Sequence, residues 1–105
     1  MGGKQHHNGF NREGLSAAAE CLKVLGHPTR LRFLQLLNEG EFSVTELAKD
    51  SEVPQNVASE HLRLMQRCGF LSQKRVGRQV FYSIAEPHLR TILKCVEDRF
   101  IDEVY

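Results

Sequence analysis

The sequence predicts a small, mainly α-helical domain with one β-hairpin, in the element order α-α-α-α-β-β-α. Two observations carry this prediction. Apolar residues recur at three- and four-residue spacing through residues 12–68 and again from residue 86 onward, which is typical of amphipathic helices. Between these stretches, extended runs at 70–75 and 79–84 flank Val76-Gly77-Arg78, where the glycine supplies the positive φ of a tight hairpin.

The first two helices are expected before residue 40. Leu15, Leu22 and Leu25 mark one apolar face of a helix that starts near residue 11, and Gly26 ends it. Pro28 suits the first turn of the next helix, where its missing N–H is not needed. This second helix holds the densest apolar cluster of the chain, so we expect it to form the core. The cluster consists of Leu31, Phe33, Leu34, Leu36 and Leu37.

A short helix, a tight turn and a longer helix follow. Ser43 is a good N-cap, and Glu46 three residues later completes a capping box for the helix at 43–50. Residues 51–53 form the turn, and Pro54 opens the helix that runs to residue 68. Its inward stripe consists of Ala58, Leu62 and Met65. With the hairpin behind it, this order is that of a winged helix-turn-helix, which places one helix in the DNA major groove.

The last helix is expected to start at Glu86-Pro87. Its apolar stripe consists of Leu89, Ile92, Leu93, Val96, Phe100 and Ile101. Residues 1–10 are polar and glycine-rich, which predicts a flexible tail. Residues 11–105 are then a single dimerising DNA-binding domain, because a helical domain this small often completes its core by dimerising.

Basic residues gather in the longer helix and the hairpin. The whole chain carries a formal charge of +1, but between residues 54 and 79 Glu60 is the only acid among several cations. Gln55 and Asn56 can each pair with adenine through two hydrogen bonds, and Ser59 can bond a base or a phosphate. Arg63 reaches a phosphate or a guanine one turn later. The hairpin adds Lys74, Arg75 and Arg78, which suit the backbone or the minor groove of the same site.

His61 also counts among the candidate DNA contacts, but it has a second interpretation. It falls on the Val57/Leu64 side of the helix, where a partly buried, hydrogen-bonded histidine is the favoured alternative.

A different function for the whole domain is a winged-helix protein–protein interaction module without DNA binding. Such a module would use the same fold. It has no reason, however, to gather Arg63 and the hairpin cations on one face.

Composition argues against several other classes. No apolar run approaches the length of a membrane span, and the polar N-terminus lacks the apolar segment of a secretory signal. The three cysteines are an odd number, which favours reduced thiols in a cytoplasmic protein over a disulfide framework. The sequence has no phosphate loop, nucleophile motif or hydrolytic metal cluster, so we do not expect an enzyme.

Three motifs together point to a known family. Residues Leu25–Arg32 (LGHPTRLR) lead into the second helix, Ser59–Arg63 (SEHLR) with Gly69–Leu71 (GFL) belong to the recognition helix, and Gly77–Tyr82 (GRQVFY) form the wing. Over residues 15–101 the chain thereby resembles the ArsR/SmtB family of bacterial winged-helix repressors. The resemblance implies a homodimer built on the first and last helices. It also implies binding to a palindromic DNA operator, from which a signal releases the protein.

The resemblance also implies where a metal would bind, and the sequence departs from the family there. One family site uses paired cysteines in the third helix, where this chain has Ser43 and Thr45, so soft-metal sensing is not expected there. A second family site lies in the last helix. Its weak candidate ligands here are Glu86, His88 and Asp102. Arg99 occupies a further ligand position and cannot bind a metal, so a divalent metal is an alternative and not the expected cofactor.

Cysteines offer another candidate effector site. Cys21 lies in the first helix and Cys95 in the last, and these helices pack together in the family's dimer, so the two thiols would form a redox pair. Cys68 is expected in the core, because a free cysteine is usually a small buried hydrophobe. Thiol oxidation, a metal, another ligand and repression without any ligand remain as alternatives.

Overall fold

The computed structural model describes residues 11–101, so the tail predicted at 1–10 and the candidate ligand Asp102 lie outside the described residues. In chain order the elements are α1 (Arg12–Leu25), α2 (Pro28–Leu37), β1 (Phe42–Ser43), α3 (Val44–Ser51), α4 (Gln55–Arg67), β2 (Leu71–Val76), β3 (Gln79–Ile84) and α5 (Leu89–Val96), which continues as a π-helical segment over Glu97–Ile101.

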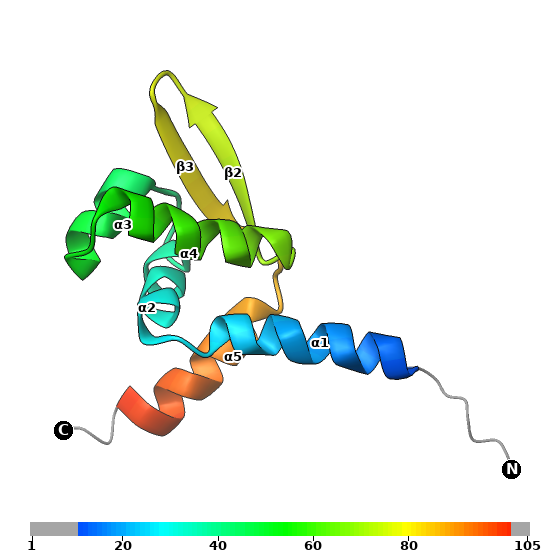
Figure 1. Ribbon diagram of the computed structural model, residues 1–105. Coiled ribbons are helices and arrows are strands. Elements are labelled where there is room, and N and C mark those ends of the chain that lie inside the picture. The colour runs from blue at the N-terminus through cyan, green and yellow to red at the C-terminus, as the bar shows by residue number, and fades with distance from the viewer. Residues whose placement is uncertain (1–10, 102–105) are drawn as a thin grey trace, which may run out of the picture.

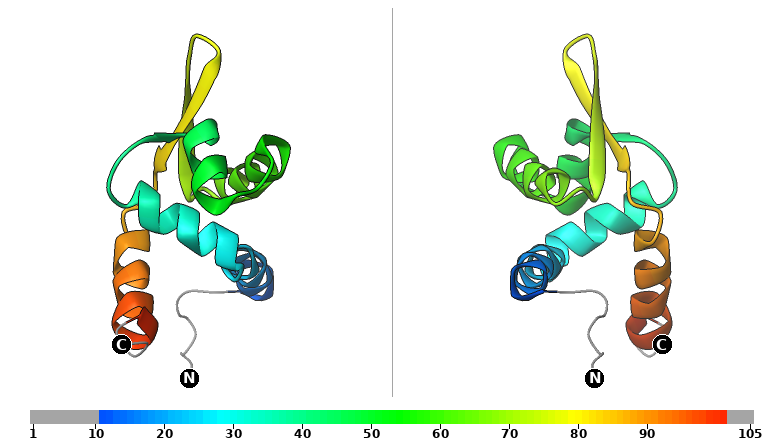
Figure 2. Two further views of the ribbon diagram at one scale, coloured as in Figure 1. Left: turned by 90° about the vertical axis from the view of Figure 1, so that its left-hand side faces the viewer. Right: turned by 90° about the vertical axis from the view of Figure 1, so that its right-hand side faces the viewer.

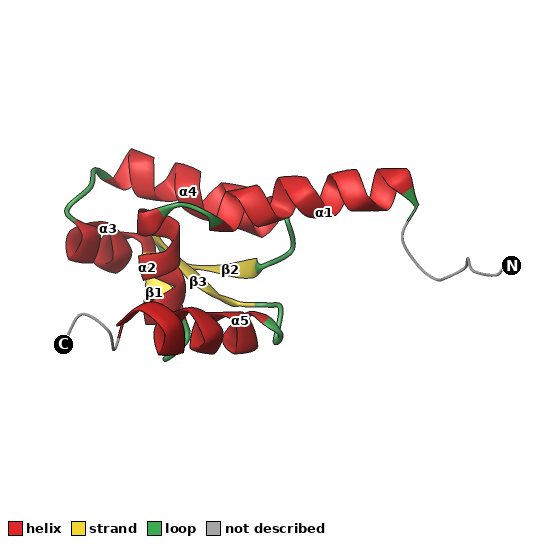
Figure 3. Cartoon of the chain, turned by 90° about the horizontal axis from the view of Figure 1, so that it is seen from below, coloured by secondary structure: helices red, strands yellow, loops and turns green. Residues whose placement is uncertain are grey.

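The β2–β3 hairpin projects from the helical body, while α1 and α5 lie at the opposite end (Figure 1). The two side views in Figure 2 show α1 and α5 as separate arms on the far side from the hairpin. Seen from below, α1 extends well beyond the rest of the domain (Figure 3). With α3 and α4 as the helix pair and β2–β3 as the wing, the predicted winged helix-turn-helix is confirmed.

One strand was absent from the predicted element order. β1 pairs antiparallel with β3, with Phe42 opposite Tyr82 and Ser43 opposite Phe81. It completes a three-stranded sheet in the order β1-β3-β2. A strand of two residues has no alternating pattern to detect, so the sequence shows only the capping box that begins there. The pairing fastens the base of the wing to the start of α3.

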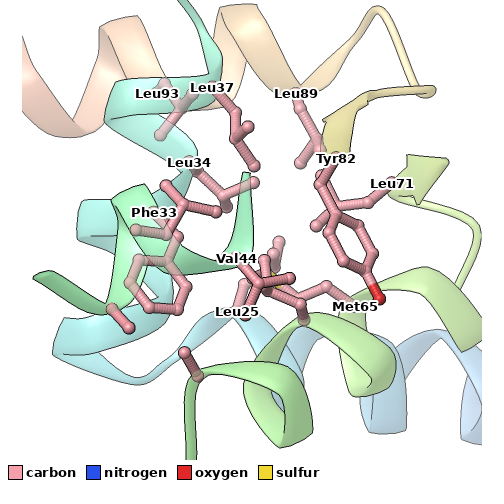
Figure 4. Close-up of a cluster of buried hydrophobic side chains, with 14 residues drawn as sticks. Leu25, Phe33, Leu34, Leu37, Val44, Met65, Leu71, Tyr82, Leu89 and Leu93 are labelled. Atoms are coloured by element: carbon pink, nitrogen blue, oxygen red, sulfur yellow. The ribbon is translucent and has the colours of Figure 1, made fainter. Parts of the chain in front are cut away.

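The core is centred on α2, as predicted. Phe33, Leu34 and Leu37 are at most 1% exposed, whereas Leu31 and Leu36 of the predicted cluster are only half-buried. Figure 4 shows the buried residues of α2 surrounded by side chains from α1, α3, α4, both wing strands and α5. Each fully buried Leu or Phe contributes about 1.5–3 kcal/mol relative to an exposed one. This one cluster therefore fixes every element that carries a candidate functional residue.

Local signals account for the element ends. The Glu46 amide donates to Ser43 Oγ at 3.1 Å and the Ser43 amide donates to Glu46 Oε1 at 2.8 Å, which confirms the capping box. Gly77 has a φ of 61° at the hairpin tip, as predicted. Proline positions were less exact: Pro54 is the residue before α4, and α5 begins at Leu89 after a turn at 87–88.

Candidate nucleic-acid interface

Helix α4 is held by one face and exposed on the other. The buried residues are Ala58, Leu62 and Met65, each with 0% exposure, as predicted. On the opposite face Gln55, Asn56 and Arg63 are exposed, and Ser59 is half-buried. The first turn carries no acidic residue and no side chain caps it. Its unpaired amides and the positive end of the helix dipole therefore suit a phosphate.

The turn between α3 and α4 has a fixed shape. Glu52 adopts the left-handed conformation with a φ of 56°, which is uncommon for a residue with a side chain. Its neighbour Val53 donates its amide to the carbonyl of Ala48 at 3.0 Å, which closes the end of α3. This turn directs the chain into α4 and so presents the polar face outward.

The wing is exposed along most of its length. From Ser72 to Gln79 every residue is exposed, including the three predicted cations. Lys74 forms an ion pair with Glu41 at 3.2 Å, which neutralises part of its charge and ties the wing to the segment before β1. Within residues 11–101, Arg75 and Arg78 have no ion-pair partner. Glu41 was missed at the sequence level, because nothing local links it to a strand 33 positions later.

His61 is half-buried and forms a hydrogen bond within the protein. Arg30 Nε donates to His61 Nδ1 at 2.9 Å, and the rings of His61 and His27 lie 4.6 Å apart between centroids. Arg30 also donates to the carbonyl of Val24 at 2.9 Å. Burial lowers the pKa of His61, and the positive charge of Arg30 lowers it further. These contacts favour the packed interpretation of His61, and its role as a DNA contact stays a prediction.

Two of the three cysteines lie close together within one chain. Within the chain Cys21 lies beside Cys68: burial raises the pKa of Cys68 to about 11, and the hydrogen bond and charge of Cys21 add to that rise. Both residues are half-buried, whereas Cys95 on α5 is exposed. The pair of Cys21 and Cys95, which would form in the dimer, stays a prediction, and Cys68 lies at the α1–α4 contact instead of deep in the core.

The candidate metal ligands do not form a metal site in the described part of the chain. Glu86 Oε2 lies 2.7 Å from His88 Nδ1 and accepts the His88 amide at 2.9 Å. The hydrogen bonds from His88 lower the pKa of Glu86. Among residues 11–101 no three side chains of the types His, Cys, Asp and Glu come together as a metal ion needs. The described residues therefore support no confident metal cofactor.

The outer faces of α1 and α5 are apolar and exposed. Leu15 and Leu22 on α1 are 56% and 60% exposed, Ile92 on α5 is 41% exposed, and Phe100 in the π-helical segment is 63% exposed. An apolar hollow of about 250 Å³ lies between α1, α2 and α5. Leu22 and Ile92 both line this hollow, and exposed apolar residues that share a hollow mark an interaction surface. No helix within residues 11–101 is long and apolar enough to cross a membrane.

These features define a class of protein: a winged helix-turn-helix domain with a polar recognition helix and a basic wing. Residues 25–73 match the family described as "Helix-turn-helix domain". The transcriptional repressor SmtB of Mycobacterium tuberculosis is 38% identical over 82 residues, which cover 78% of this chain and 61% of that protein. This chain thus spans less than two thirds of the length of that curated relative.

Solved structures agree with the sequence match. The transcriptional repressor BigR from Xylella fastidiosa is 30% identical with a TM-score of 0.73, over 87% of this chain and 97% of that one. The fold is also that of Mb0332 from Mycobacterium bovis, described as a homodimeric winged helix-turn-helix DNA-binding domain (24% identity, TM-score 0.77, 94% of each chain). The chain belongs to the ArsR/SmtB family of helix-turn-helix transcriptional regulators, as its motifs indicate. This family consists of regulators and not of enzymes.

Proposed function

We propose that this protein is a sequence-specific DNA-binding transcriptional regulator, a dimeric repressor that acts in the cytoplasm. The outer face of α4 carries the proposal. It presents Gln55, Asn56 and Arg63 to solvent, while the inner face of the same helix is completely buried and therefore fixed. Arg75 and Arg78 stand on the wing beside it as free cations among the described residues.

Each side chain then has a distinct role in DNA binding. Gln55 and Asn56 read base edges in the major groove, where an amide can make two hydrogen bonds to adenine. Ser59 and Arg63 follow on the same face and contact a base or a phosphate. The wing cations neutralise the backbone or enter the minor groove, and Lys74 contributes less because Glu41 holds it.

The dimer is proposed to form through α1 and α5. Their exposed apolar residues and the hollow between them give each chain a surface that a second copy of the chain can cover. Two α4 helices would then enter successive major grooves of a palindromic operator, about 34–36 Å apart.

The test begins with selection of preferred sites from a random duplex library, followed by titration at several salt concentrations. Replacing Gln55 and Asn56 together by alanine should reduce the preference for the selected site, since each paired base contact discriminates by about 1–3 kcal/mol. Replacing Arg78 by alanine should weaken all sequences alike and reduce the salt slope by about 2 per dimer, because one phosphate contact is lost from each chain. Unchanged selectivity in the first variant would show that α4 is not the reader.

The alternative function, a protein–protein interaction module, makes the opposite prediction in the same titration. Such a module would not bind random duplex DNA in a salt-dependent way. Binding that disappears as salt rises supports the phosphate contacts of the wing, and no binding even in dilute buffer would favour the module.

Three modes of regulation remain candidates. The protein is released from DNA by thiol oxidation, it is released by metal binding, or it represses without any ligand. They can be separated by measuring operator binding with a reductant, an oxidant and a panel of divalent metals. A thiol mechanism predicts a response that Cys21→Ser or Cys95→Ser removes, and a metal mechanism predicts one that His88→Ala removes. Ligand-independent repression predicts no response to any treatment.

A further inference from the structure

Three polar side chains meet where the wing joins the recognition helix. Gln73 Nε2 on β2 donates to Gln66 Oε1 on α4 at 2.9 Å, and the Tyr82 hydroxyl on β3 donates to the same oxygen at 3.4 Å. Gln73 Nε2 also lies 3.4 Å from the Tyr82 hydroxyl. We call these three residues the α4–wing cluster.

The cluster connects both strands of the wing to one atom of α4, the Gln66 side-chain oxygen. Gln73 and Tyr82 are directly opposite each other in the antiparallel register, so their side chains lie on the same face of the hairpin. The Gln66 carbonyl oxygen has two lone pairs and accepts from both residues. A change in the angle between α4 and the hairpin would therefore alter the geometry of both bonds at once.

Tyr82 makes the cluster rigid on the core side. The residue is 3% exposed, and Figure 4 shows its ring within the buried cluster with the hydroxyl directed toward α4. Burial also raises the pKa of Tyr82, so the hydroxyl keeps its proton and remains a donor. The cluster thus joins a fixed core residue to the exposed part of the wing.

The outer part of the wing, from residue 72 to residue 79, is exposed, so its direction is set at the base. In β2 only Leu71 is buried, and the following five residues are all exposed. Besides the cluster, the base of the wing is held by the pairing of β1 with β3, by the Lys74–Glu41 ion pair and by core packing of Leu71, Val80 and Ile84. From Gln73 to the Gly77 tip the strand spans about 13 Å. A rotation of roughly 10° at the base would move the tip by about 2 Å, which is enough to lose a hydrogen bond.

We propose that Gln66 and Gln73 are positioning residues that set the angle of the wing, so that Arg78 meets the DNA backbone while α4 lies in the groove. This inference rests on the proposed DNA-binding function. Neither glutamine needs to touch DNA for this role. Their effect is transmitted through the position of Arg78, which gives it a signature that a purely stabilising contact lacks.

A double-mutant cycle tests this role. The dissociation constant for the selected operator is measured, at one salt concentration, for the wild type, Arg78→Ala, Gln66→Met and the double variant. In the wild type, Arg78→Ala should weaken binding by about tenfold or more, the size expected for a charged contact. In the Gln66→Met background the same change should weaken binding by less than about threefold, because Arg78 is already displaced.

Two further variants make the result specific. Gln73→Thr removes the Gln73–Gln66 bond from the strand side and leaves α4 unchanged, so it should also reduce the coupling; a loss of coupling in Gln66→Met alone would instead indicate that this variant perturbs α4. Ser72→Ala is the matched control, since Ser72 Oγ pairs with Ser83 Oγ at 3.1 Å within the hairpin. It should leave the effect of Arg78→Ala unchanged. Thermal melting of every variant checks that the fold is retained.

The possible outcomes separate this inference from the proposed function. Equal factors for Arg78→Ala in the wild type and in both glutamine backgrounds would overturn the positioning role and leave DNA binding intact. If Arg78→Ala binds the operator as tightly as the wild type does, the proposed DNA contact of the wing is wrong. The positioning role, which depends on that contact, is then wrong as well.

Discussion

The outward faces of α4 and of the two terminal helices are both exposed, but they are chemically opposite. On α4 the exposed positions are all polar or charged, while on α1 and α5 they include Leu15, Leu22 and Ile92. The inner sides of all three helices belong to one core. One core therefore holds two exposed interaction surfaces in place, and the chemistry of each surface indicates the partner that it binds.

The two surfaces also differ in what exposure costs. A polar face is solvated well in water, so α4 is stable with or without DNA. An exposed leucine or phenylalanine loses about 1.5–3 kcal/mol that burial would supply. The apolar face of α1 and α5 is therefore expected to be covered permanently, and the polar face only when the operator is bound.

The largest expected effect comes from reversing the chemistry of the apolar face. Leu22→Glu combined with Ile92→Glu would bury four unpaired carboxylates per dimer, at several kcal/mol each. The dimer dissociation constant should rise by roughly a thousandfold or more, and operator affinity should fall with it. Sedimentation velocity and operator titration measure the two quantities.

The matched control places the same charges on neighbouring polar positions. Ser16 and Thr91 are exposed, so Ser16→Glu combined with Thr91→Glu adds equal charge without entering the apolar face. This variant should remain a dimer. If the Leu22/Ile92 variant also sediments as a dimer, the dimer interface lies elsewhere on the molecule and the apolar face of α1 and α5 does not form it.

Much of the fold was predictable because its signals are local. The capping box at Ser43, the hairpin glycine and the buried stripe of α4 each depend on residues within a few positions of one another. The outward position of Gln55 and Asn56 follows from the same periodicity. Local chemistry thus predicts which face of α4 is free to read DNA.

Features that depend on distant residues were not predictable in the same way. β1 exists only through its pairing with β3, and Lys74 meets Glu41 only after the sheet has formed. The contact of Cys21 with Cys68 depends on the packing of α1 against α4. Helical periodicity gives the side of a helix on which a residue lies, but not the residue that it meets there.

A smaller effect is expected where α4 and the end of α1 are linked through Arg30. Arg30 donates both to His61 on α4 and to the Val24 carbonyl at the end of α1. The pKa of His61 lies below its ordinary value of 6.5, through burial first, then through Arg30 and His27, against the opposing charge of Glu60. The unfolded chain therefore binds this proton at higher pH than the folded one. Stability from His61 is fully present above about pH 6.5 and decreases as the pH falls through the folded pKa.

His61→Gln isolates this contribution, because a glutamine oxygen can accept from Arg30 and does not titrate. Urea unfolding at a series of pH values between 5 and 8 should give a shallower loss of stability for the variant than for the wild type. Parallel curves would show that the joint between α1 and α4 does not respond to protons.

The smallest expected effect lies in the turn that aims α4. Glu52 is the one described residue other than glycine with a positive φ, a conformation that asparagine tolerates better than glutamate. Its negative charge at the C-terminal end of α3 is also unfavourable to the helix dipole. Glu52→Asn should therefore raise the free energy of unfolding by up to about 1 kcal/mol, measured by urea denaturation. Glu39→Asn, in the loop between α2 and β1, is the control and should not raise it. A loss of stability in Glu52→Asn would mean that the glutamate side chain, and not the backbone alone, holds the turn from which the recognition helix starts.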